Sequence, residues 1–324
     1  MLFLRVDTAP EVTISTVSSA ASTRVVTVDG IGEVIPGFPD GLMAVKRSDG
    51  QSLGLVLWPE RGAPSERSVP VGASSPPDPV AFDVSGRLLA TMLPAPGEVG
   101  GVLYAGVPDA ARIIALDVTG HAWHDSDPSA LAYTSAGDGE TMLWVTRGNL
   151  TESELVTETA GEEAAIAAWG AWGYALQDGE SAVLLTDTGE TSQTSSGRIL
   201  SSNPDGLIAL DDDGLKLLSV SGEVREVPGF GFEGPVLAAS FAPAGGLLGV
   251  LTVEGLAVTS GEAEVAEALE RPGVPQVVWS SDGRYVLYPG LRGVVVLDTS
   301  DGSVRELMPE SIFTGFAVLD FDGS

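Results

Sequence analysis

The sequence predicts an all-β fold built from repeated antiparallel units, and three observations carry this prediction. The chain has 324 residues, 44% of them hydrophobic, which is enough for a large core. Gly and Pro are frequent and separate short runs rich in Val, Leu and Thr, a composition typical of many strands joined by turns. The third observation is a hairpin, in which apolar runs at 277–279 and 285–288 flank the turn Ser281-Asp282-Gly283.

The turn of this hairpin recurs along the chain at a nearly constant interval. The equivalent anchor positions are Gly41, Gly86, Asp127, Gly173, Gly206, Gly245, Gly283 and Gly323. Their mean spacing is about 40 residues, which is the period of four-stranded propeller blades. We therefore predict a β-propeller of four-stranded antiparallel blades.

A column of large apolar residues supports the same register. Four residues before the anchors stand Phe82, Trp123, Trp169, Phe241, Trp279 and Leu319, whereas Gly37 and Ser202 are the exceptions. Large side chains at one position of every blade can fill the space between adjacent sheets. We interpret the column as core between blades and not as a binding site.

The blades follow one another in chain order. Seven of them occupy 33–308, at about 33–71, 80–118, 122–157, 165–191, 199–227, 236–269 and 277–307. Residues 72–79, rich in Pro, Ser and Gly, form a connecting loop. The segment 262–271 is the one candidate for a short helix, and an outer strand is the alternative.

The two ends of the chain together supply one further blade. A strand at 315–321 stops at its turn, and the N-terminus offers three strands, at 2–6, 11–17 and 24–28. We expect 2–6 to pair with 315–321, so that 1–29 and 311–324 close the fold and remove free sheet edges. This predicts a single domain over 1–324 with eight blades. Seven blades is the alternative, if the first 20 residues are only a linker.

The charge limits the classes of partner. The net charge is −29, from 45 acidic and 16 basic residues, and such a surface repels phosphate backbones and anionic lipid heads. We expect no nucleic acid, and no membrane insertion because no apolar run approaches 18 residues. The acidic residues indicate solubility and a monomer, because they keep sheet edges apart. A halophilic or marine source and a cationic partner are the alternatives.

Metal sites have two weak candidates. The chain has no Cys, which excludes disulfides and thiolate ligands, and its two histidines are His121 and His124, with Asp125 and Asp127 close by. Imidazole and carboxylate groups can share a metal, but strand alternation puts 121 and 124 on opposite faces. We interpret this stretch as polar residues at a strand entrance, with metal binding at His124 and Asp125 as the alternative.

The second metal candidate is calcium at an acidic turn. The sequences Asp211-Asp212-Asp213-Gly214 and Asp320-Phe321-Asp322-Gly323 resemble calcium loops, with Asp211 and Asp213 as candidate ligands. Both lack the spacing of five or six oxygen ligands, and both lie where a hairpin turn is due. No cofactor is therefore the first expectation, and calcium the alternative.

Catalytic motifs are missing from the sequence. It contains no nucleophile elbow, phosphate-binding loop or zinc-protease helix. Pairs of carboxylates arise by chance among 45 acidic residues, so they have no specificity for glycoside hydrolysis. We predict a non-catalytic binding or scaffold module that docks a protein or small ligand on one propeller face. The alternative is a propeller hydrolase or lyase with an acidic site in the central channel.

The hairpin and the strand after it, 279–297, resemble the repeat of TolB-like and WD40-like propellers, and Phe82-Asp83-Val84-Ser85-Gly86-Arg87 is similar. The Trp-Asp pair of eukaryotic repeats is absent, so the resemblance is closer to the bacterial TolB type. Arg outnumbers Lys 14 to 2, which indicates a GC-rich bacterial or archaeal genome. The resemblance implies a binding platform and favours an extracytoplasmic location, periplasmic or cell-surface, with cytoplasmic as the alternative. No functional residue is carried over, because propeller sites lie on variable loops.

Overall fold

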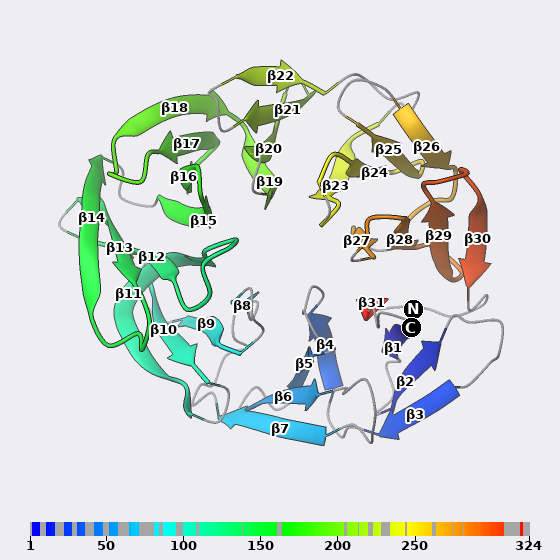
Figure 1. Cartoon of the computed structure of the whole chain (residues 1–324), viewed down its shortest axis with the longest axis horizontal. Coiled ribbons are helices and arrows are strands. Elements are labelled where there is room, and N and C mark those ends of the chain that lie inside the picture. Colours follow the sequence, from blue (N-terminus) through cyan, green and yellow to red (C-terminus); the bar gives the residue numbers. More distant parts are fainter. Residues whose placement is uncertain are drawn as a thin grey trace. The chain divides into compact units, whose positions relative to one another are not determined.

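The computed structural model describes most of the chain between residues 81 and 307 and strand segments on either side. The described residues are 81–83, 87–94, 100–107, 110–137, 139–160, 164–203, 206–212, 214–219, 223–227, 234–243, 245–260, 264–273, 275–280 and 282–307, with the strand segments 2–6, 11–16, 23–27, 31–35, 42–47, 52–57, 65–70 and 318–319. All regular structure in these residues is antiparallel β-sheet (Figure 1). The all-β fold class is thus confirmed.

The chain divides into two compact units. One comprises Met1–Asp49, Gly54–Glu66 and Glu226–Ser324, and the other Gly50–Leu53 and Arg67–Arg225. A single domain over 1–324, closure of the fold and the number of blades stay predictions.

The first and last strands of the chain share a sheet. It has the order β3-β2-β1-β31 and contains β1 (Leu2–Val6), β2 (Glu11–Thr16), β3 (Thr23–Thr27) and β31 (Val318–Leu319). The strand β31 pairs antiparallel with β1, with Leu2 opposite Leu319. This is the strand order that the two ends of the sequence predict, and the other residues of 315–321 lie outside the described residues. The following sheet contains β4 (Ile31–Ile35), β5 (Leu42–Arg47), β6 (Ser52–Leu57) and β7 (Ser65–Pro70).

A seven-stranded sheet follows, with the order β14-β13-β12-β11-β10-β9-β8. Its strands are β8 (Ala81–Phe82), β9 (Leu89–Pro94), β10 (Gly101–Gly106), β11 (Arg112–Trp123), β12 (Leu131–Ala136), β13 (Glu140–Thr146) and β14 (Ser153–Ala160). The long strand β11 pairs with β10 through its first half and with β12 through its second. Irregular register surrounds Asp117, whose φ of 57° is unusual for a residue with a side chain. Two four-stranded groups therefore share one strand, where the sequence predicts two separate blades.

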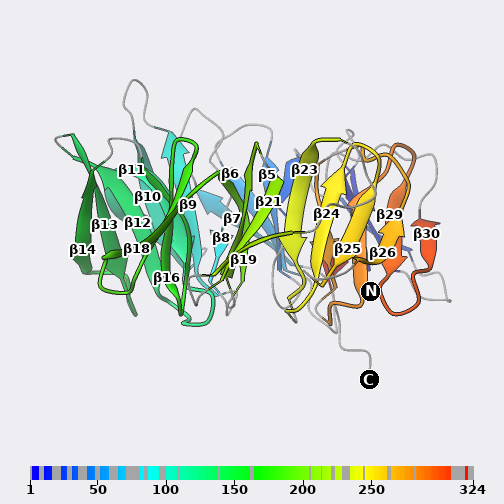
Figure 2. The ribbon, with the colours of Figure 1, turned by 90° about the horizontal axis from the view of Figure 1, so that it is seen from above.

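Four further sheets have four strands each in simple up-and-down order. They contain β15 (Ala165–Gly170), β16 (Gly173–Asp178), β17 (Ser181–Leu185) and β18 (Thr191–Ser196); β19 (Arg198–Asn203), β20 (Gly206–Asp211), β21 (Gly214–Ser219) and β22 (Val224–Glu226); β23 (Val236–Phe241), β24 (Leu248–Thr252), β25 (Leu256–Thr259) and β26 (Glu264–Ala268); and β27 (Val278–Trp279), β28 (Tyr285–Pro289), β29 (Val294–Asp298) and β30 (Val304–Leu307). Figure 2 shows β23, β24, β25 and β26 running side by side.

The expected short helix at 262–271 is wrong, and its alternative is correct. The strand β26 occupies the middle of this segment. Ala266 and Ala268 are buried, whereas Glu267 between them is exposed. This alternation has period two, which suits a strand against a core and not a helix.

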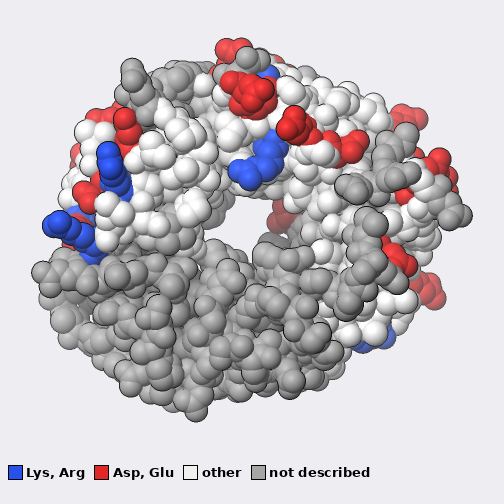
Figure 3. All heavy atoms as spheres, turned by 180° about the vertical axis from the view of Figure 1, so that it is seen from behind, with Lys and Arg blue, Asp and Glu red and all other residues white. Residues whose placement is uncertain are grey.

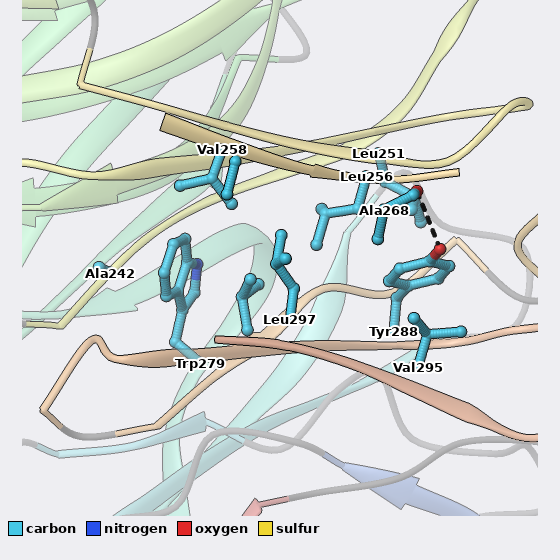
Figure 4. Close-up of a cluster of buried hydrophobic side chains, with 11 residues drawn as sticks. Ala242, Leu251, Leu256, Val258, Ala268, Trp279, Tyr288, Val295 and Leu297 are labelled. Atoms are coloured by element: carbon cyan, nitrogen blue, oxygen red, sulfur yellow. Dashed lines mark hydrogen bonds between the residues drawn. The ribbon is translucent and has the colours of Figure 1, made fainter. Parts of the chain in front are cut away.

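The predicted column of large side chains packs between neighbouring sheets. Trp123, Trp169 and Trp279 are all buried. Trp279 lies in a cluster with Leu251, Val258 and Leu297, which come from two adjacent sheets (Figure 4). A cluster of this size supplies most of the free energy that holds two sheets together, because burial of each large apolar side chain contributes about 1.5–3 kcal/mol.

Hydrogen bonds from the indole rings add direction to this packing. Trp279 Nε1 donates to the backbone oxygen of Ser240 at 3.0 Å, and Trp123 Nε1 donates to that of Ala81 at 3.1 Å. Both acceptors immediately precede the column residue of the preceding repeat, Phe241 or Phe82. Trp279 therefore fills the space between two sheets and fixes their relative register, whereas Trp123 makes the equivalent bond between β11 and β8 of the seven-stranded sheet.

The hairpin from which the period was read is held by its polar residues. Asp282 Oδ1 accepts hydrogen bonds from Ser280 Oγ at 2.6 Å and from the backbone N–H of Arg284 at 3.0 Å. The Arg284 guanidinium donates to both oxygens of Asp298, and Ser300 donates to Oδ1 of the same carboxylate. Asp298 thereby joins the start of β28 to the turn after β29.

We expect Trp279→Phe to lower the free energy of unfolding by about 1–3 kcal/mol, because it leaves the Ser240 carbonyl without this donor while keeping an aromatic ring. Urea denaturation measures the change. Trp144→Phe is the matched control, since Trp144 Nε1 donates to a Ser135 hydroxyl that can rotate to another partner. An unchanged midpoint for Trp279→Phe would show that the bond between sheets contributes nothing.

The ion pair at Asp298 predicts acid sensitivity. The hydrogen bonds from Arg284 hold the pKa of Asp298 well below its usual range, so folding favours the ionised carboxylate. The resulting stability is fully present above the unfolded pKa of about 4 and is lost as the pH falls below it. Urea midpoints measured between pH 5 and pH 2 should fall more steeply for the wild type than for Asp298→Asn. Parallel curves would contradict the prediction.

Candidate functional site

The turn that joins β11 to β12 contains the first pair of predicted site residues. His124 follows Trp123, the column residue, and pairs with Trp169 of the next sheet in an isolated bridge. The backbone N–H of Asp125 donates to the Trp169 carbonyl at 3.1 Å. These contacts place His124 and Asp125 beside the turn between β15 and β16.

The His124 ring is engaged by the turn itself. Its Nδ1 accepts the backbone N–H of Asp127 at 2.9 Å and that of Ser126 at 3.2 Å. An atom that accepts these bonds carries the lone pair, which assigns the ring proton to Nε2. The ring also meets Trp169 edge-on, with centroids 4.7 Å apart. Nδ1 therefore serves the backbone and is not free for a metal.

Asp125 is the least satisfied group in the turn. Both of its carboxylate oxygens are buried without a hydrogen-bond partner. Oδ1 lies 3.3 Å from His124 Nδ1, and Oδ2 lies so close to Gly170 that a Cβ there would be 2.5 Å away. A buried carboxylate without partners is costly, and such groups are enriched at functional sites. Asp125 is thus the strongest of the sequence-predicted candidates in chemical terms.

His121 has surroundings that differ from those of His124. It lies on β11 opposite Tyr133, and its ring contacts the backbone of Ala90. Its Nε2 is buried without a partner, and burial lowers its pKa from 6.5 to about 4. His121 is therefore neutral near pH 7 and belongs to the core of its sheet.

The acidic turn at 211–214 is stabilised by its own side chains. Asp211 Oδ1 accepts the backbone N–H of Gly214 at 3.1 Å, and Oδ2 accepts the hydroxyl of Ser196 at 2.6 Å and pairs with Lys216. These contacts use Asp211 to close a hairpin. Asp213 and the second acidic turn, 320–323, lie outside the described residues, so calcium at either turn stays a prediction.

The structure does not gather the predicted ligands into one cluster. Among the described residues, no group of three or more His, Asp or Glu side chains is arranged to hold a metal ion. Asp211 closes the β20–β21 hairpin, whereas His124 and Asp125 lie at the β11–β12 turn.

Sequence reasoning missed the residues that surround Asp125. Arg147 lies over the Trp169 ring, with its guanidinium carbon 5.6 Å from the centroid, and Trp169 stacks on Tyr174 at 5.4 Å. Trp172 Nε1 donates to the Asn203 carbonyl at 3.1 Å, which links this turn to the next sheet. The sequence signal was the Gly-Ala-Trp-Gly turn at 170–173, because a Gly on each side of a Trp permits close backbone approach.

Comparisons with known proteins support the fold and leave the family open. No family model and no curated protein matches the sequence. Among solved structures, a eukaryotic initiation factor is similar with a TM-score of 0.56 and 12% identity, over 94% of this chain and 84% of that one. The chain thus has the all-β fold of a β-propeller.

Two further solved structures are less similar. Hsv2 of Kluyvelomyces marxianus has a TM-score of 0.49 and 10% identity, over 68% of this chain and 75% of that one. A nidogen/laminin complex has a TM-score of 0.39 and 10% identity, over 98% and 97%. In the part of the chain that the structure describes, no helix could span a membrane.

The buried His121 predicts a loss of stability in mild acid. The folded state holds the pKa of His121 at about 4, so between pH 6.5 and pH 4 the unfolded chain binds a proton that the folded chain does not. The free energy of unfolding should then decrease as the pH falls, by up to about 1.4 kcal/mol per pH unit. Urea denaturation of the wild type and of His121→Gln measures this slope. Equal slopes would mean that His121 is protonated in the folded state.

Proposed function

We propose that this protein is a non-catalytic binding module whose propeller docks a protein partner through its turns. The observation that carries the proposal is how the candidate groups are used. His124 accepts backbone N–H groups, Asp211 closes a hairpin with Lys216, and Asp298 holds Arg284. Each of these side chains stabilises the sheets, which suits a scaffold whose variable turns carry the function.

A closer kinship to TolB-like propellers is part of the same proposal. It rests on the hairpin at 279–297, whose Ser280, Asp282 and Arg284 form a linked turn, and on the arrangement of strands that follows. An extracytoplasmic location and a bacterial source follow from that kinship and belong to the proposal with it.

One observation favours a hydrolase or lyase instead. The unpartnered carboxylate of Asp125 lies 3.3 Å from a histidine nitrogen, and general acid–base catalysis uses such groups. However, His124 Nδ1 already accepts two backbone N–H groups, which opposes its use as a base. The binding module is therefore the first proposal and the enzyme the second.

The test combines binding and turnover on the same protein. The full chain is immobilised, captured proteins are identified, and each is measured as a purified partner by calorimetry. In parallel, the chain is incubated with glycoside, ester and polysaccharide-lyase substrates. We expect saturable 1:1 binding that Asp125→Asn leaves unchanged, and no turnover. Turnover that Asp125→Asn abolishes, without any saturable partner, would establish the enzyme.

A further inference from the structure

Between the second and third strands, the β16–β17 turn contains Gly179 and Glu180, and the β20–β21 turn contains Asp212. The β24–β25 turn, Val253-Glu254-Gly255, and the β28–β29 turn, Gly290 to Gly293, also contain glycine, but each adds one exposed apolar residue. These are Val253 and Leu291, which are 41% and 58% exposed. Turn geometry favours Gly, Asn and Asp, so the fold itself does not require these two side chains.

A third exposed residue adjoins both turns. Leu269 follows β26 and is 69% exposed. A Cβ on Gly255, in the turn of Val253, would lie 3.2 Å from the Leu269 Cα. Two residues later, the Arg271 carbonyl accepts the N–H of Leu291 at 3.2 Å. Val253, Leu269 and Leu291 thus lie on three adjoining segments of one compact unit, and we call them the apolar corner.

The backbone of the corner is held in place. Tyr288 Oη donates to the Ala268 carbonyl at 3.2 Å (Figure 4) and to the Glu270 carbonyl at 2.8 Å, on either side of Leu269. Gly273 N–H donates to the Pro289 carbonyl at 2.7 Å, which fixes the same segment to β28. The backbone around Leu269 is therefore fixed in the conformation that exposes this side chain. A surface held in advance loses little conformational entropy when a partner binds.

Charged residues around the corner indicate the kind of partner. Glu254, Glu267 and Glu270 are exposed beside Val253 and Leu269, and Arg271 and Arg292 are exposed beside Leu291. Acidic residues also outnumber basic ones on the face in Figure 3, in a chain with a net charge of −29. The net charge of the chain and the three acidic residues on the Val253 and Leu269 side of the corner favour a cationic segment there, whereas Arg271 and Arg292 make the Leu291 side basic.

We propose that the apolar corner docks a peptide segment of a protein partner, in which large apolar side chains stand next to Lys or Arg. The apolar side chains cover Leu269, Leu291 and Val253, and the basic ones pair with Glu254, Glu267 or Glu270. This inference rests on the proposed binding function and gives it a location and a class of ligand.

The experiment selects ligands without knowing the partner. A phage-displayed library of random peptides is panned on the immobilised full chain, with removal of phage that bind the double variant Leu269→Asp/Leu291→Asp. Selected peptides are synthesised and measured by fluorescence polarisation. We expect apolar peptides rich in Lys and Arg, bound at least about tenfold more weakly by the double variant, as for central anchors of an interface.

Two further variants act as controls. Leu116→Asp changes a leucine that is 60% exposed on β11 of the other compact unit, and should leave the affinity within about twofold. Glu254→Gln/Glu270→Gln should weaken binding and flatten its dependence on salt, because exposed charges are screened by ions. Circular dichroism confirms that each variant is folded, which surface substitutions should permit.

Three outcomes would overturn the proposal. Failure to enrich any peptide, or equal binding by wild type and double variant, removes the corner as a docking site. If a protein captured by the full chain binds the double variant as tightly as the wild type, the corner is wrong but the binding function stands. If the chain dimerises and the double variant is a monomer, the corner is instead an interface between copies.

Discussion

The packing of neighbouring sheets within each compact unit depends on large side chains placed between them, as Trp169 and Trp279 show. Trp279 buries its ring among residues of two sheets and donates its N–H to a backbone carbonyl of the neighbour. The packing term is large but has no direction, whereas the hydrogen bond is weaker but fixes register. Because one residue supplies both, its position in the repeat cannot move without moving the turn that follows. This coupling explains why Trp123, Trp169 and Trp279 each stand four residues before an anchor position.

Polar residues at the turns stabilise the ends of the hairpins by hydrogen bonds to the backbone. A hairpin of this kind exposes backbone N–H groups at its end, and a short acceptor side chain can satisfy them. Asp282, Asp211 and His124 all play this part, although their residue types also suggest metal or acid–base chemistry. Asp125 differs. The backbone N–H groups of Ser126 and Asp127 donate to His124, and the carboxylate oxygens of Asp125 receive no hydrogen bond.

The sequence predicts the strands well because their signal is local. Alternation of apolar residues and Gly-containing turns lies within a few positions, so the hairpin at 279–288 and the order of the terminal strands follow from it. The prediction of a helix at 262–271 was wrong because the apolar residues of so short a segment fit both the helical and the strand period. Only the strand that it pairs with decides between the two. Here β25 and the alanines at 266 and 268 select the strand.

The surroundings of the candidate site could not be predicted in the same way. Arg147 reaches Trp169 from a turn 22 residues away in sequence, and Trp172 reaches Asn203 across 31 residues. No periodic signal records such contacts, because they depend on how two sheets pack. The repeat does, however, allow equivalent turns of different sheets to be compared with one another. Turn positions at which most described sheets carry Gly or an acidic residue indicate what the fold requires there, so the exposed apolar side chains of Val253 and Leu291 are not explained by turn geometry.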